Sequence, residues 1–255
     1  MKTFLFAFYQ LTKLPLPVLR FDEKACGRST IFFPAVGLVL GLLLVALWWA
    51  AGLIFPVFVQ ASLLIAGMFY LTGGIHLDGF MDTVDGILSG KQRERKLEIM
   101  RDSRVGALGV AGFFCLYILK FALLCEMPGH LMIKVLPVVF ALSRWGMAVA
   151  VAAFPYAREE GLGKVYSVYT GAREALGASI IAAAAAGVVM GMAGICLMVL
   201  SGVVTVLAGK KLSRELGGLT GDTYGFINEF MEVLLLAAVF PLLKINEVLQ
   251  VFSLL

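Results

Sequence analysis

Long runs of residues without any charge are the feature of this sequence that most restricts its fold. Residues 31–55 and 57–75 contain no charged residue, and the uncharged run 175–209 is longer still. About 20 apolar residues are enough to cross the ~30 Å hydrocarbon core of a bilayer as a helix. Few charges interrupt three further apolar runs, at 105–125, 131–154 and 226–243. The pattern predicts an all-α, polytopic integral membrane protein.

The composition supports this class and excludes others. Of the 255 residues, 60% are hydrophobic and only 15% are charged, whereas about a quarter are charged in a typical soluble domain. A soluble enzyme, a disordered chain and a nucleic-acid-binding domain are therefore excluded, and the net charge of +4 does not by itself indicate a nucleic-acid partner. The four cysteines form no CxxC pair, so neither a zinc site nor a disulfide framework is expected.

The run 175–209 is compatible with one very long helix or with two helices that turn near residues 191–194. Short cytoplasmic loops collect Lys and Arg. With two helices, all but four of the 21 basic residues fall on one side of the membrane. We therefore predict about seven transmembrane helices with a cytoplasmic N-terminus. The chain is expected to be a single membrane-embedded catalytic domain over residues 1–255, with an interfacial N-terminal segment (1–28), a cytoplasmic acidic and basic segment (76–104) and a second acidic segment (210–229).

Three aspartates follow the second apolar run at helical spacing. Asp78, Asp82 and Asp85 stand at positions i, i+4 and i+7, within about 60° of one another on a helix. Carboxylates on one face repel each other unless a cation lies between them, and oxygen ligands suit Mg²⁺, Mn²⁺ or Ca²⁺. We predict a metal site here, the alternative being a solvated loop with scattered acids. His76 projects to the opposite side of the helix, where a catalytic and an orienting role are both open.

A second segment repeats the pattern of the first. Residues 217–222 read Gly-Gly-aliphatic-x-x-Asp, as residues 73–78 do, and Glu229 follows Asp222 by seven residues as Asp85 follows Asp78. We predict that both segments contribute acids to one site, with Asp222 as a catalytic base or second-metal support and Glu229 as a metal ligand. Gly217 and Gly218 are expected to let the backbone approach phosphate. The alternatives are that Asp222 only caps the last helix and that the repeat is a coincidence.

Several cations are candidates for binding phosphate. Most of the charged run 91–104 is expected to be a solvated surface helix, but Arg101 and Arg104 lie closest to the next span. We assign Arg104 as a catalytic candidate and Arg101 as a substrate-binding one. Arg144 and Arg158 are also assigned as substrate-binding residues. Arg144, inside a span, must be paired or face a polar cavity, and Arg158 belongs to the segment 156–163, which is expected to form part of a lid. Acids that bind a metal, together with arginines, favour phosphoryl or nucleotidyl transfer.

These motifs resemble those of a known family. Residues 73–86 (GGIHLDGFMDTVDG) and 97–106 (LEIMRDSRVG) resemble the signature of the cobalamin synthases, the adenosylcobinamide-GDP ribazoletransferases. Residues 156–163 and 217–225 resemble the later motifs of that family. The resemblance implies that a ribose hydroxyl of α-ribazole, or of its 5′-phosphate, attacks the cobinamide-linked phosphorus of adenosylcobinamide-GDP, with release of GMP and a requirement for Mg²⁺.

The resemblance also implies a place in the cell and a set of partners. It places the chain in the cytoplasmic membrane of a bacterium or archaeon, and the topology from the basic residues puts both acidic segments on the cytoplasmic side. The expected partners are the corrinoid-GDP and α-ribazole substrates and the lipid bilayer, with no nucleic acid. A homo-oligomer and complexes with other enzymes of cobalamin synthesis are compatible with this assignment.

Two other functions are compatible with parts of this sequence. Asp82-x-x-Asp85-Gly86 also begins like the motif of CDP-alcohol phosphatidyltransferases, but Ser89-Gly90 stands where that motif has Ala-Arg. An ion-coupled transporter would likewise place acids and glycines at broken helices. Its acids would lie near the bilayer midplane, whereas those of residues 78–85 are expected where the second span reaches the cytoplasm.

Overall fold

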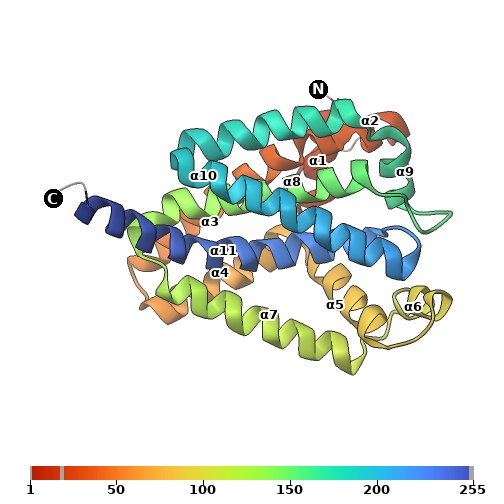
Figure 1. Cartoon of the computed structure of the whole chain (residues 1–255), viewed down its shortest axis with the longest axis horizontal. Coiled ribbons are helices and arrows are strands. Elements are labelled where there is room, and N and C mark those ends of the chain that lie inside the picture. The colour runs from red at the N-terminus through yellow and green to blue at the C-terminus, as the bar shows by residue number, and fades with distance from the viewer. Residues whose placement is uncertain (1, 18–19, 253–255) are drawn as a thin grey trace.

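The apolar runs form helices that lie side by side, most of them along a common direction (Figure 1). The computed structural model describes residues 2–17 and 20–252. Its helices are α1 (Lys2–Leu11), α2 (Glu23–Gly27), the 3-10 helix η1 (Arg28–Phe32), α3 (Phe33–Gly52), α4 (Val57–Thr72), α5 (Ile75–Leu88), α6 (Arg93–Ile99), α7 (Ala107–Glu126), the 3-10 helix η2 (Gly129–Leu131), α8 (Met132–Ala153), α9 (Leu162–Tyr169), α10 (Ala172–Leu216) and α11 (Gly221–Phe252). The described residues form no strand, and one isolated β-bridge joins Tyr156 to Leu219. The all-α prediction is confirmed.

Helix α8 forms the centre of the bundle. Nearly all its side chains are buried, and it packs against α3, α10 and α11. A helix that is apolar on every side belongs in a protein core or a bilayer, and α8 takes the core position. Helix α3 comes especially close, because a Cβ atom at Gly37 would lie 2.1 Å from the carbonyl oxygen of Phe140. Glycine in α3 therefore allows the backbones of the two helices to touch.

Helix α10 turns back on itself at Gly191. This residue has φ 59° and ψ −136°, which are not helical angles. A Cβ atom at Gly194 would lie 2.1 Å from the carbonyl oxygen of Ala186, so the two halves touch beside the turn. Both halves also reach Trp145 of α8, since its Nε1 donates to Ser179 Oγ at 2.9 Å and its ring contacts Gly202. The prediction that this run holds two helices is confirmed.

Several helices are long and apolar enough to cross a bilayer. Among the described residues there are five, or six when α4 and α5, bent by 94°, are taken as one broken span, with α10 counted once. A polytopic membrane protein is thus confirmed, while the seven-span count and the side of the N-terminus stay predictions. In the N-terminal segment, Phe6, Phe8 and Leu11 of α1 are buried, and α1 packs on η1, α2 and α3.

The segments predicted to be cytoplasmic gather at one end of the bundle. Helices α6 and α9, the end of α5, the end of α10 and the start of α11 all lie at the right in Figure 1. The turn between α3 and α4 and the turn within α10 lie at the opposite end. Residues more than a hundred positions apart in the chain therefore meet at a single face, which is where the acidic motifs lie.

Candidate active site

The two Gly-Gly pairs mark the two places where one helix ends and another begins at an angle. Gly73 and Gly74 have φ of 65° and 71° and separate α4 from α5. Gly217 and Gly218 have φ of 74° and 150° and separate α10 from α11. Glycine adopts such positive φ values at little cost, unlike other residues. The repeated sequence pattern thus has a structural counterpart, a sharp helix break followed by an acid in the first turn.

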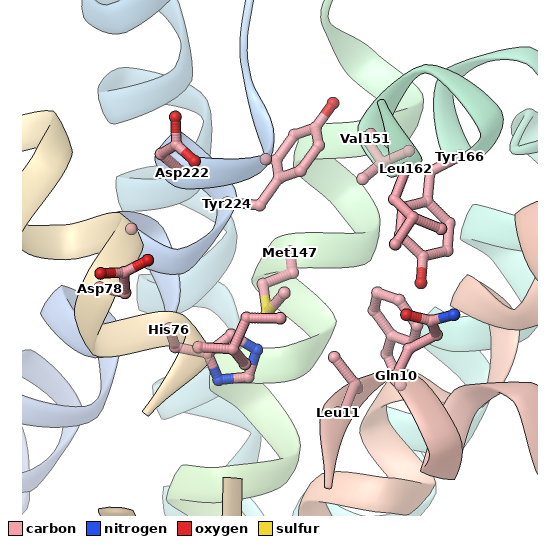
Figure 2. Close-up of a pocket in the computed structure, with 15 residues that line it drawn as sticks. Gln10, Leu11, His76, Asp78, Met147, Val151, Leu162, Tyr166, Asp222 and Tyr224 are labelled. Carbon is pink, nitrogen blue, oxygen red and sulfur yellow. The ribbon is translucent and has the colours of Figure 1, made fainter. Parts of the chain in front are cut away.

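The N-terminal parts of α5 and α11 cross in backbone contact. A Cβ atom at Gly79 would lie 2.7 Å from the carbonyl oxygen of Asp222, and one at Gly225 would lie 2.8 Å from the carbonyl oxygen of His76. Both positions therefore require the absence of a side chain. The crossing brings Asp78 and Asp222, which are far apart in sequence, to the wall of the same pocket (Figure 2).

This pocket is a largely apolar cavity of about 180 Å³. Its walls come from α1, α3, α5, α8, α9 and α11 and include the rings of Phe33, Tyr166 and Tyr224. Besides the two tyrosine hydroxyls, its polar side chains are Gln10, His76, Asp78 and Asp222. In Figure 2 the two acids lie on one side of the pocket, with Gln10 and Tyr166 on the other. A cavity lined by apolar groups with a few convergent polar ones is typical of a site for a small molecule.

Asp222 is held by Arg158 from the loop between α8 and α9. Arg158 Nη2 lies 2.5 Å from Asp222 Oδ2, and both side chains are mostly covered. The loop is fixed by two backbone hydrogen bonds of 2.8 Å to Leu219, one on each side of the bridge at Tyr156, and Gly218 leaves room for this contact. Burial raises the pKa of Tyr156 in this loop. The predicted lid loop is therefore tied to the start of α11.

Asp222 is not the residue that caps α11. Thr223 N donates to Thr220 Oγ1 at 3.2 Å, and Thr220 N donates to Thr223 Oγ1 at 2.8 Å. This reciprocal pair satisfies backbone N–H groups at the start of the helix, as a capping box does. The Asp222 carboxylate instead faces Arg158 and the pocket, so the capping alternative does not explain why an acid stands here.

The aspartates of α5 divide into two kinds. Asp85 is buried, and its two carboxylate oxygens accept hydrogen bonds of 2.8 Å from the backbone N–H groups of Gly106 and Gly109 at the start of α7. In the part of the chain that the structure describes, no hydrogen bond or ion pair engages the carboxylates of Asp78 and Asp82. Asp82 lies within electrostatic range of Asp78, Asp222 and Arg158. The acids that remain available at the site are thus Asp78, Asp82 and Asp222.

These acids do not form a ready-made metal site. No group of three or more His, Cys, Asp or Glu side chains among the described residues is arranged to hold a metal ion. Mg²⁺ usually keeps several waters and binds proteins through one or two carboxylates together with substrate phosphates. Two unpaired carboxylates on α5, facing a third from α11, fit a metal that the substrate brings or completes.

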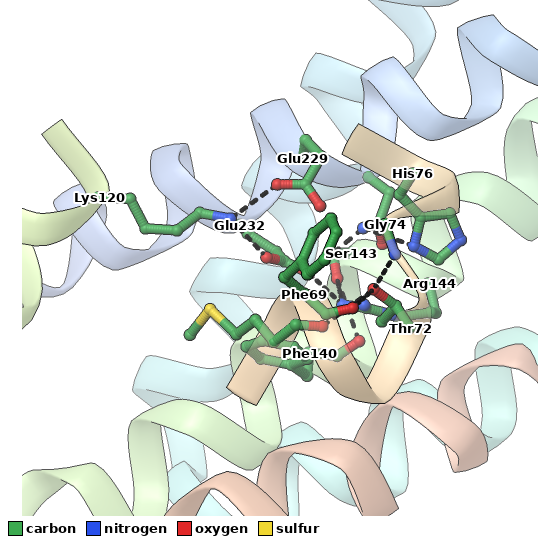
Figure 3. A network of polar contacts seen from close by, with 12 residues as sticks. Phe69, Thr72, Gly74, His76, Lys120, Phe140, Ser143, Arg144, Glu229 and Glu232 are labelled. Atoms are coloured by element: carbon green, nitrogen blue, oxygen red, sulfur yellow. Dashed lines mark hydrogen bonds and ion pairs between the residues drawn. The ribbon is translucent and has the colours of Figure 1, made fainter. Parts of the chain in front are cut away.

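Glu229 and Arg144 lie in a different place from the one their predicted roles require. Both belong to a buried charge network between α7, α8 and α11 (Figure 3). Lys120 Nζ lies 2.7 Å from Glu229 Oε2 and 2.8 Å from Glu232 Oε2, and Arg144 pairs with Glu232. Each charge is therefore matched inside the bundle. The expectation that Arg144 must be paired is met, but neither side chain lines the pocket, so the structure does not bring Glu229 to the acids of α5.

The network contains two residues that the sequence reasoning did not single out, Lys120 and Glu232. Both are buried, with 0% and 2% of the side chain exposed. Their signal was present in the sequence, because two acids in the last span and one cation in each of two other spans have to neutralise one another in a bilayer. Both second acids of the repeat, Asp85 and Glu229, bind α7. The shared spacing thus serves packing against α7 rather than a shared ion.

The remaining candidates lie around the rim or in the helix breaks. Arg101 lines a groove of about 400 Å³ that it shares with Arg158 and several acids of α6 and the 155–161 loop. Arg104 is exposed and binds Asp102, and this hydrogen bond lowers the pKa of Asp102 to about 2. Gly217 packs against the Arg93 guanidinium. Gly217 and Gly218 both lie outside the pocket lining and form the helix break between α10 and α11.

Arg158 connects the apolar pocket to this groove. It pairs with Asp222 in the pocket wall and also lines the groove. Helix α6, which forms one side of the groove, is attached to the end of α10 by an ion pair between Lys96 and Glu215. A ligand that occupied both spaces would have an apolar part beside Phe33 and a charged part beside Arg101, with Arg158 and the acids in between.

Comparisons with known proteins show the family to which this chain is related. The sequence profile of the family described as cobalamin-5-phosphate synthase matches residues 3–240. Proteins named adenosylcobinamide-GDP ribazoletransferase are similar along most of the chain. The one from Roseiflexus sp. (strain RS-1) is 42% identical over 89% of this chain and 85% of its own length. The one from Desulfitobacterium hafniense (strain Y51) is 40% identical over 91% of this chain and 94% of its own length.

No solved structure matches the chain. The profile match nonetheless covers both acidic motifs and every residue that lines the pocket. The family predicted from the four motifs is thereby confirmed. The chain belongs to the cobalamin-5-phosphate synthase family.

Proposed function

We propose that this chain is an adenosylcobinamide-GDP ribazoletransferase that requires Mg²⁺. A ribose hydroxyl of α-ribazole, or of its 5′-phosphate, attacks the cobinamide-linked phosphorus of the diphosphate. The new bond joins that oxygen to phosphorus, the bond from phosphorus to the GMP oxygen breaks, and the hydroxyl proton leaves to a base. The observation that carries the proposal is the meeting of Asp78 and Asp222 at one pocket, with Arg158 between that pocket and a second groove.

The available acids suit a metal-bridged diphosphate. Asp78 and Asp82 on α5 are the residues that would hold Mg²⁺ beside the substrate phosphates, and Asp222 of α11 lies in the wall of the same pocket. When bound, Mg²⁺ neutralises phosphate oxygens and stabilises the charge that develops on the leaving group. Asp85 is left out of this set, because both of its oxygens already bind backbone N–H groups of α7.

Arg158 and Asp222 have complementary roles in this scheme. In the structure the two neutralise each other. A phosphate group that enters between them competes with the carboxylate for the guanidinium, since arginine binds phosphate with two parallel hydrogen bonds. Asp222 then loses its partner and can accept the proton of the attacking hydroxyl, provided that the hydroxyl lies within hydrogen-bond reach. Arg101, at the groove, would bind the nucleotide part of the diphosphate.

The membrane orientation follows from charge. The end of the bundle that carries the pocket also carries the basic segments, and Lys and Arg favour the cytoplasmic side. We therefore propose that the site opens to the cytoplasm, where GDP-linked substrates and Mg²⁺ are available.

The proposal is tested with the purified full-length protein in detergent. A corrinoid-GDP substrate and α-ribazole are supplied with and without Mg²⁺, and GMP is measured by chromatography. We expect GMP in equal amount to the new corrinoid product, only with both substrates and Mg²⁺. Turnover of CDP-diacylglycerol with an alcohol acceptor instead would assign the chain to the phosphatidyltransferase chemistry, and turnover of neither substrate would refute the proposal.

A further inference from the structure

The buried charge network ends at a histidine that faces the pocket. Asn228 Nδ2 lies 3.2 Å from Glu232 Oε1 and 3.3 Å from His76 Nδ1. His76 is 3% exposed and lines the pocket, and its Nε2 has no partner in the described part of the chain. A buried polar atom without a partner needs an explanation, and the ligand of the pocket supplies one.

The network sets the direction of every hydrogen bond along this path. Glu232 lies between Lys120 and Arg144, so it is ionised and can only accept. Asn228 must therefore turn its NH2 group, and not its carbonyl oxygen, toward Glu232. The same NH2 nitrogen faces His76 Nδ1, so Nδ1 must be an acceptor. An imidazole whose Nδ1 accepts carries its proton on Nε2.

The pocket around that N–H group suits one kind of ligand. Its walls hold the rings of Phe33, Tyr166 and Tyr224, and Met147 lies above the imidazole in Figure 2. Such a space fits a flat aromatic heterocycle that has one ring nitrogen with a free lone pair. The acids lie on the opposite side of the pocket from Tyr166 (Figure 2), so a nucleoside bound there would keep its ribose beside them.

We propose that His76 donates its Nε2–H to the free ring nitrogen of the benzimidazole base of α-ribazole. Asn228, oriented by Glu232, is a positioning residue that sets the tautomer of His76. This inference rests on the proposed function, and it gives His76 the role of a hydrogen-bond donor that recognises the base rather than that of a proton acceptor.

The tautomer is measured directly by NMR. The chain has two histidines, and His130 is exposed in η2 at the other end of the bundle, so His130→Gln leaves His76 as the single histidine. With ¹⁵N-histidine in this variant, we expect a protonated Nε2 and an unprotonated Nδ1, and a shift of the Nε2 signal when α-ribazole is added. A proton on Nδ1, a doubly protonated ring or an unchanged signal with α-ribazole would each overturn the inference.

Kinetics then test the contact with the base. Replacing the benzimidazole of the nucleoside by indole removes the acceptor nitrogen and keeps the shape. In the unmodified protein we expect the KM for the indole nucleoside to be about tenfold higher, as for the loss of one buried hydrogen bond. In His76→Leu the two nucleosides should differ by less than about twofold, and His76→Gln, which keeps an N–H donor, should restore part of the difference.

The outcomes separate this inference from the proposed function. Equal KM values for both nucleosides in the unmodified protein, or an unchanged ratio in His76→Leu, would refute the role of His76 while GMP release continues. A normal NMR response to α-ribazole without any GMP release would refute the proposed reaction and leave the base-binding role of His76 in place.

Discussion

Replacing Asp222 by asparagine separates a chemical role of this carboxylate from a structural one. The variant Asp222→Asn keeps the size and shape of the side chain, and the cap of α11 does not depend on it, because Thr220 and Thr223 provide that cap. What changes is the charge that faces Arg158 and the pocket.

The structural cost of this change is small. Arg158 and Asp222 have 13% and 21% of their side chains exposed, so their interaction is only partly screened by solvent. A hydrogen bond to a charged group contributes roughly 1.5–3 kcal/mol, and an asparagine oxygen retains part of it. We expect a loss of about 1 kcal/mol in the free energy of unfolding.

The catalytic cost is much larger if Asp222 takes the proton of the attacking hydroxyl. General-base catalysis contributes about 10²- to 10⁴-fold to the rate, which corresponds to about 3–5 kcal/mol in the barrier. We therefore expect kcat, measured as GMP release under saturating substrates, to fall at least about a hundredfold, with the unfolding midpoint in detergent little changed.

A matched control is available at the same end of the molecule. Glu215→Gln breaks the ion pair with Lys96, which attaches α6 to α10 but lies outside the pocket. Because Glu215 is exposed and water screens its ion pair, the unfolding midpoint should change little and kcat should be retained. If Asp222→Asn turns over at the normal rate, or if both variants lose kcat equally, the catalytic role is refuted.

Three further predictions follow from the same structure. Asp82→Asn should abolish GMP release at Mg²⁺ concentrations that saturate the unmodified protein, and its thermal midpoint should stay the same or rise because one charge of a repelling group is removed. Normal activity of this variant at low Mg²⁺ would exclude Asp82 from the metal site. Lys120→Met leaves two buried carboxylates without their shared cation and should lower the free energy of unfolding by about 3–5 kcal/mol, and adding Glu229→Gln should recover part of this loss. An unchanged unfolding midpoint for Lys120→Met would show that the network does not stabilise the bundle. In a variant without native cysteines, an impermeant thiol reagent applied to intact cells should label a cysteine at the exposed position 134 and not one at the exposed position 210. The opposite labelling would refute the proposed orientation.

Much of the fold could be read from the chain alone, for a simple physical reason. A bilayer accepts only segments that satisfy their own backbone hydrogen bonds, so each long apolar run has to become a helix. The hairpin in α10 was also predictable, because it alone keeps the basic residues on one side, and a glycine stands at the turn. Helix ends differ from the predicted runs by a few residues, since the spans extend into the interface.

The site was only partly predictable. The Gly-Gly repeat indicated that Asp78 and Asp222 belong together, and the crossing of α5 and α11 brings them to one pocket. The same spacing argument failed for Glu229, which binds Lys120 instead. Helical spacing states which residues share a face of one helix, but it does not state which neighbour that face meets.

What the sequence by itself determined is therefore the class of protein, its family and the acids that define its chemistry, because these depend on composition and local pattern. Tertiary structure alone decided which charges are used up inside the bundle and which remain free. Asp85 binds the start of α7, and Glu232 neutralises Arg144, whereas Asp78 and Asp82 keep no partner among the described residues. The physical reason is that a charge in a low-dielectric interior is stable only beside a counter-charge or hydrogen-bond donors, and those partners are set by how helices pack, not by their order in the chain.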